Sequence, residues 1–218
     1  VRLQYYPDYT STAELAASLN HEGKVTAAGY YRFNAVGYDF QFLGGIYSES
    51  DWIAGAGWSG DIKGAGFRGE ATWLWPAEGR DSGRIFHAML SLDYTFTHSL
   101  YLQLESLYTW ESVKSSSGGF FEYYMDALSI KRLSFSELNF FARISYPLTP
   151  IFNISLSGMY YPDISGFYIG PDLRYSLKDN AEVSLIVQAF SGEFPDPVTG
   201  VLSQNELVLG FIRYKFNF

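Results

Sequence analysis

Few side chains in this sequence have the types and spacing that an active site needs. The chain contains no cysteine, which excludes a disulfide framework, a thiolate metal site and a cysteine nucleophile. His21, His87 and His98 are too dispersed to indicate a metal site. His87 precedes Ser91 and Asp93, residue types that serve with histidine in nucleophilic catalysis. On a strand, residues four and six apart are too distant for direct hydrogen bonds at about 3.3 Å per residue. We therefore predict no enzyme, no bound metal and no cofactor.

One glycine-rich motif has the letter pattern of a nucleotide-binding loop. The run Gly64-Ala-Gly-Phe-Arg-Gly69 matches the GxGxxG pattern of nucleotide-binding loops. That mechanism requires a helix directly after the glycines, so that the helix N-terminus meets the pyrophosphate. Here Glu70 to Trp75 alternate between polar and apolar residues as a strand does. The glycines are therefore predicted to allow a tight turn or close strand packing.

Composition favours a strand protein that crosses a membrane. Aromatic residues make up 19% of the chain, with 18 Tyr, 18 Phe and 5 Trp, an excess that transmembrane barrels place in two interfacial girdles. No run approaches the roughly 18 apolar residues of a spanning helix, and the mean hydropathy of −0.05 is what alternating strands average to. A net charge of −8 argues against nucleic acid as a partner.

Apolar and polar residues alternate with a period of two almost from end to end. The pattern is clearest near the C-terminus, where Val208, Ile212 and Tyr214 share one face and Arg213 and Lys215 the other. Twelve segments follow this rule: 13–19, 25–33, 38–46, 52–58, 67–75, 86–96, 100–111, 137–146, 152–160, 167–175, 182–189 and 206–218. The sequence therefore predicts an all-β fold, a transmembrane antiparallel up-and-down β-barrel with about twelve visible strands.

The links between these segments alternate in length. Those near 34–37, 61–63, 97–99, 148–150 and 178–180 are tight, whereas 76–83, 111–134 and 193–202 are longer; the links at 20–24, 47–51 and 161–165 break this rule by being short. Short turns on one side and long loops on the other are typical of outer-membrane barrels. We expect residues 1–218 to form a single domain, in which residues 1–10 are either a periplasmic lead-in or a partial additional strand.

Two segments carry a family resemblance. The run Phe211-Ile-Arg-Tyr-Lys-Phe-Asn-Phe218 resembles the terminal-strand signature by which bacterial outer-membrane barrels are recognised for assembly, with Tyr214, Phe216 and Phe218 as its aromatic positions. The stretch from Gly57 to Trp73, with Val1 to Pro7 ahead of it, is similar to the later part of a group of porin-like outer-membrane proteins. This resemblance implies a longer chain, with further strands before position 1, in the outer membrane of a Gram-negative bacterium.

The polar face of such a barrel would line a pore. The residues predicted to do so are Arg32, Asp39, Arg68, Glu70, His87, Asp93, Glu105, Glu137, Arg143, Asp172, Arg174, Glu182, Arg213 and Lys215. Both signs of charge are present, so they either create a transverse field in a water-filled pore or pair across a narrow lumen and seal it. The expected partners are membrane lipid and lipopolysaccharide, the barrel assembly machinery through the C-terminal strand, and a homo-oligomer or another outer-membrane protein complex.

Two functions fit this pattern. The first is a porin-like channel for passive diffusion of small hydrophilic solutes through a charged lumen. The second is a structural or docking barrel with a plugged lumen in an outer-membrane assembly. The loop from Glu111 to Ser134 bears on the choice, because it contains Phe120, Phe121, Tyr123, Tyr124 and Met125. It is expected either to fold inward as a constriction or to present an aromatic surface, with a short helical turn over 120–128.

Overall fold

The computed structural model describes residues 1–77, 83–113, 130–134, 136–196 and 199–217. They form thirteen strands and one 3₁₀ turn: β1 (Arg2–Tyr5), β2 (Thr12–Leu19), β3 (Val25–Ala35), β4 (Tyr38–Tyr47), β5 (Asp51–Ile62), β6 (Ala65–Pro76), β7 (Ile85–Thr95), β8 (Tyr101–Glu111), β9 (Leu138–Thr149), β10 (Phe152–Tyr161), η1 (Pro162–Ile164), β11 (Gly166–Lys178), β12 (Ala181–Pro195) and β13 (Leu202–Phe216). Within the described ranges, no helix is long and apolar enough to cross a membrane. The expected helical turn over 120–128 lies outside the described residues.

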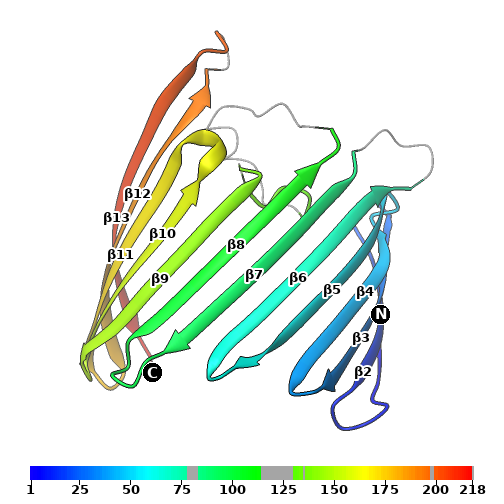
Figure 1. The fold of residues 1–218 in the computed structure, drawn as a ribbon, viewed down its shortest axis with the longest axis horizontal. Helices are drawn as coiled ribbons and strands as arrows, with labels where there is room; N and C mark the ends of the chain where they lie inside the picture. Colours follow the sequence, from blue (N-terminus) through cyan, green and yellow to red (C-terminus); the bar gives the residue numbers. More distant parts are fainter. Residues whose placement is uncertain (78–82, 114–129, 135, 197–198, 218) are drawn as a thin grey trace. The chain divides into compact units, whose positions relative to one another are not determined.

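The strands lie in one sheet in chain order, from β1 to β13, and run up and down (Figure 1). The twelve predicted strands are confirmed, and the alternating run at Val1 to Tyr6 forms the additional strand β1. Among the described strands, β1 and β13 are the two ends of this order, and no pairing joins them. The all-β antiparallel fold is therefore established for the described strands.

The described contacts divide the sheet into two units. The first contains described residues 1–77, 83–91, 107–113 and 130–133; the second contains 92–106, 134, 136–196 and 199–217. Within the first, Trp52 of β5 lies opposite Trp75 of β6. Within the second, β12 and β13 pair without a shift of register from Ala181↔Phe216 to Pro195↔Leu202. β12 extends to Pro195 and β13 begins at Leu202, so the strands include both ends of the link that the sequence predicted over 193–202, because pairing continues through residues with no strand pattern.

Two of the tight links contain successive residues with positive φ. Val36 and Gly37 have φ of 54° and 79°, and Lys63 and Gly64 have φ of 53° and 88°. Two successive residues in the left-handed region make the tight hairpin turn whose twist matches that of the flanking strands. Within the second unit, the β9–β10 and β11–β12 links lie at one end of their strands and the β10–β11 and β12–β13 links at the other (Figure 1).

The glycine motif is confirmed as a structural feature. Gly64 occupies the turn before β6, and β6 itself follows, so no helix is present for a phosphate to meet. Gly69 lies under the indole of Trp58, and a Cβ built at Gly69 would be 2.3 Å from that ring. The absence of a side chain at position 69 therefore allows the Trp58 ring to cover the neighbouring strand.

Exposure differs sharply between the two faces of the sheet. We call apolar face the one that carries Ile212 and Tyr214 on β13, and polar face the one that carries Arg213 and Lys215. Large side chains of the apolar face are exposed from β4 to β13: Phe42, Trp52, Trp73, Leu90, Leu104, Tyr108, Ile144, Leu156, Phe167, Leu173, Leu185 and Ile212. Nothing in the described residues packs over these side chains as a core would.

The turn at Val36 generates a stability prediction. Val36 is β-branched, has a left-handed φ of 54° and is 98% exposed, so it is strained without any compensating packing. We expect Val36→Asn to stabilise the fold by about 1 kcal/mol, because asparagine tolerates this conformation. The measurement is the denaturant midpoint of the refolded protein. Val36→Ile is the control and should leave the midpoint unchanged, whereas a lower midpoint for Val36→Asn would contradict the prediction.

Candidate functional site

The polar face contains a buried polar cluster in the first unit. Asp51 at the start of β5, His87 on β7 and Thr109 on β8 are all buried, with Asp51 at 0% exposure. Each follows the strand alternation, because Trp52, Phe86 and Trp110 are on the opposite face. Among the described residues, the buried side chains include more polar ones than hydrophobic ones. A water-soluble domain shows the opposite pattern, because it buries mainly hydrophobic side chains.

His87 is held on both sides of its ring. Nε2 lies 3.0 Å from the backbone carbonyl of Ile130, and Nδ1 lies 3.0 Å from the hydroxyl oxygen of Thr109. A carbonyl can only accept, so Nε2 carries a hydrogen, and the neutral ring then accepts the Thr109 hydroxyl proton at Nδ1. This geometry gives His87 a positioning role, in which it anchors the chain at Ile130 to the polar face.

The next residue of the same segment makes an ion pair. Nζ of Lys131 is 2.6 Å from a carboxylate oxygen of Asp51, and the Ser50 hydroxyl donates to that oxygen at 2.6 Å. The Asp51 side chain is 1% exposed, whereas that of Lys131 is 31% exposed. A carboxylate buried to this degree is tolerated only when cations or donors surround it. The described end of the long loop thus contacts β7 through Ile130 and β5 through Lys131; the aromatic residues at 120–125 lie outside the described ranges.

A second charged cluster lies on the polar face of the second unit. Arg174 is 3.4 Å from Asp172 and 3.7 Å from Glu182, and Arg213 is 3.6 Å from the same Glu182 oxygen. Lys215 lies directly opposite Glu182 in the β12–β13 register. The five residues were all predicted from the sequence, and the structure brings them together across three adjacent strands.

The other predicted charged residues are placed as follows. Arg32 and Asp39 pair across β3 and β4 at 3.6 Å, and Glu105 on β8 accepts a hydrogen bond from Gln103 at 2.7 Å. Arg68 and Glu70 lie on β6, Asp93 on β7 and Arg143 on β9, whereas Glu137 precedes β9 and donates its backbone N–H to Asp163 at 2.6 Å. Tyr214 and Phe216 lie on β13, and Phe218 is outside the described residues.

Sequence reasoning missed several members of the polar face. Arg2 on β1 pairs with Glu14 on β2 at 2.6 Å, and Arg2 was not among the residues predicted to line the pore. Asp51 could have been found from its alternation with Trp52, but nothing in the pattern of residues 111–134 indicated that Lys131 would reach it. No group of three or more potential metal ligands occurs in the portion of the chain with described positions.

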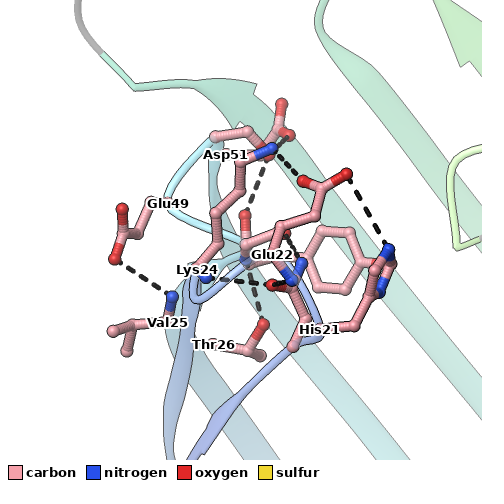
Figure 2. A network of polar contacts seen from close by, with 11 residues as sticks. His21, Glu22, Lys24, Val25, Thr26, Glu49 and Asp51 are labelled. Atoms are coloured by element: carbon pink, nitrogen blue, oxygen red, sulfur yellow. Dashed lines mark hydrogen bonds and ion pairs between the residues drawn. The ribbon is translucent and has the colours of Figure 1, made fainter.

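The β2–β3 turn and the β4–β5 turn are hydrogen-bonded to each other (Figure 2). Val25 donates its N–H to the Glu49 carboxylate at 3.0 Å, Glu49 donates its N–H to the Val25 carbonyl at 2.9 Å, and Ser48 donates to the Thr26 hydroxyl at 3.0 Å. Glu22 accepts a hydrogen bond from Lys24 beside them. These bonds explain why the two links can be short, since each turn satisfies the backbone of the other.

Lys24 also affects the titration of this turn. The hydrogen bond from its ammonium, followed by its charge, lowers the pKa of Glu22 below the ordinary carboxyl value. A folded-state pKa below the unfolded one means that the stabilisation is present above the ordinary carboxyl pKa and is lost as pH falls through the lower folded value. The turn is therefore predicted to keep this contact throughout the neutral range.

The comparisons with known proteins assign no family. No family matches the sequence, and no curated protein matches it either. The function is therefore inferred from the geometry of the two faces.

The buried ion pair generates a second prediction. Lys131→Met is expected to destabilise the fold by about 3 kcal/mol, because it removes a cation from a carboxylate that water cannot reach. Lys24→Met is the matched control and removes the cation from the exposed Glu22 pair, so it should lower the stability much less than Lys131→Met does. Denaturant unfolding of both variants measures the difference. Equal costs would show that the Asp51 contact is not a structural anchor.

Proposed function

We propose that the chain forms a porin-like β-barrel in the outer membrane of a Gram-negative bacterium and allows small hydrophilic solutes to diffuse through its polar interior. The single observation that carries this proposal is the inversion of the two faces. Large apolar side chains are exposed at alternate positions of many strands, while the other face holds buried polar residues such as Asp51 and His87. Hydrocarbon around the apolar face makes the exposure of its large side chains favourable, whereas water there would make it unfavourable.

Backbone chemistry supports the same environment. In hydrocarbon every N–H and C=O must be paired, which only helices and closed barrels achieve. The strand order from β1 to β13 therefore requires either pairing of its two ends or further strands between them. An even strand count is usual in bacterial single-chain barrels, so thirteen strands favour additional strands. The alternating aromatic residues Tyr214 and Phe216 on β13 resemble those of strands in outer-membrane barrels, which supports the outer membrane as the location.

A plugged docking barrel is the second candidate, and one observation favours it. The segment that contains Ile130 and Lys131 lies on the polar face and is anchored by a buried ion pair and by His87. In a closed barrel, a segment in this position would narrow the lumen. If the narrowing is complete, the barrel is a docking element; if water remains, the segment is a constriction that selects solutes by size and charge.

Membrane insertion is tested by a pair of variants on β10. Leu156 is 46% exposed on the apolar face, and its neighbour Ser155 lies on the polar face opposite Asp172. Leu156→Arg is expected to destabilise the protein in lipid vesicles by about 2–4 kcal/mol, and Ser155→Arg by less than about 1 kcal/mol, since its charge meets a carboxylate. The readout is urea unfolding followed by heat-dependent gel mobility. If Leu156→Arg is tolerated as well as Ser155→Arg, the apolar face does not contact hydrocarbon.

Conduction is tested with the purified full chain in planar lipid bilayers. An open porin-like channel predicts stable, stepwise ion conductance, and a plugged barrel predicts none. Lys131→Met should increase the step size, because the variant releases the segment from Asp51, while Lys24→Met in the exposed turn should leave the step unchanged. Absence of steps for all three proteins, together with a copurifying partner, would replace the channel by the docking barrel.

A further inference from the structure

The polar face of the last two strands contains an apolar strip that ends at the cationic cluster. On β13, Leu207, Leu209 and Phe211 lie at alternate positions and are followed by Arg213 and Lys215. The register places Ile186 of β12 opposite Phe211, and Ser184 opposite Arg213. We call these six side chains, Ile186, Leu207, Leu209, Phe211, Arg213 and Lys215, the amphipathic strip.

The strip places three large apolar side chains at successive polar-face positions of one strand. Val208 and Ile212 already supply the apolar face of β13, so this strand is apolar on both faces from Leu207 to Ile212. Phe211 is 47% exposed on the polar face, where a water-filled interior would favour a polar residue. β13 is one end of the described strand order, and a further strand would pair with its edge and leave its faces open, so a ligand that approaches from the polar side can contact this ring.

The charges at the end of the strip are only partly neutralised. Arg213 and Arg174 converge on one oxygen of Glu182 at 3.6 and 3.7 Å, both longer than the roughly 2.7–2.9 Å of a charge-assisted hydrogen bond. Arg213 also approaches the Ser184 hydroxyl at 3.5 Å. With Lys215, three cations face Asp172 and Glu182, so the local charge is positive in a chain of net charge −8.

We propose that the amphipathic strip binds an amphipathic monoanion, a solute with a linear apolar body and one carboxylate. Three alternate apolar positions and the first cation follow one another along β13, so that Leu207 to Phe211 spans about 13 Å and Arg213 lies about 7 Å beyond Phe211. The apolar body lies on Phe211, Leu209 and Ile186, and the carboxylate accepts hydrogen bonds from Arg213 with Lys215 close by. This inference names a solute class for the proposed channel and depends on that proposal for access to the polar face.

The test uses the full chain in neutral maltoside micelles with 11-(dansylamino)undecanoate as the fluorescent probe. Protein-dependent emission above that of micelles alone is measured, and octanoate and 1-octanol are compared as competitors. Phe211→Ser should weaken probe binding about tenfold, because the variant lacks the ring that the apolar body of the probe would cover. Ile212→Ser is the matched control on the same strand and opposite face, and it should leave binding unchanged. Arg213→Gln should remove the preference for octanoate over octanol.

The outcomes are distinct. Equal loss in Phe211→Ser and Ile212→Ser, equal competition by octanoate and octanol, or no protein-dependent emission each overturns the proposal. Because binding in micelles requires no conduction, failure here together with stepwise conductance in bilayers rejects the solute class and leaves the channel intact. Binding that depends on Phe211 and Arg213 without any conductance keeps the site and rejects the channel.

Discussion

The alternation of side chains along paired strands is the constraint on which the rest of this structure depends. Because successive residues point to opposite faces, one strand can meet two different solvents, and a one-residue slip would exchange them. The register from Ala181↔Phe216 to Pro195↔Leu202 keeps Ile212 on one face and Arg213 on the other. The ion pairs between neighbouring strands, such as Arg213 with Glu182, depend on this phase being preserved.

Local patterns explain how much of the fold could be predicted from the sequence. Twelve strands, the tight turns and the structural role of Gly64 to Gly69 follow from neighbouring residues, so the sequence contains them directly. The extension of β12 to Pro195 could not be predicted, because pairing with β13 rather than any strand pattern maintains it. Prediction therefore succeeded where the cause was local and failed where it lay in a partner strand.

The same distinction applies to the candidate site, where contacts between adjacent strands could be predicted and contacts of loop residues could not. The cluster of Asp172, Arg174, Glu182 and Arg213 was predicted, since each residue occupies a polar-face position and adjacent strands bring them together. The contact between Lys131 and Asp51 joins residues far apart in the chain, and loop residues carry no period from which such a contact can be read. Thr109 was not predicted, because nothing in the sequence pattern indicates that its hydroxyl lies 3.0 Å from Nδ1 of His87.

The central claim is that hydrocarbon surrounds the apolar face, and the absence of cysteine makes it directly measurable. Single cysteines along β12, at Glu182, Val183, Leu185, Ile186, Val187 and Gln188, would carry nitroxide labels in the protein reconstituted in vesicles. We predict that collision with oxygen is greatest at Val183, Leu185 and Val187, and that collision with a water-soluble nickel complex is greatest at the other three. A scan with no period of two, or with both faces equally accessible to nickel, would contradict the account.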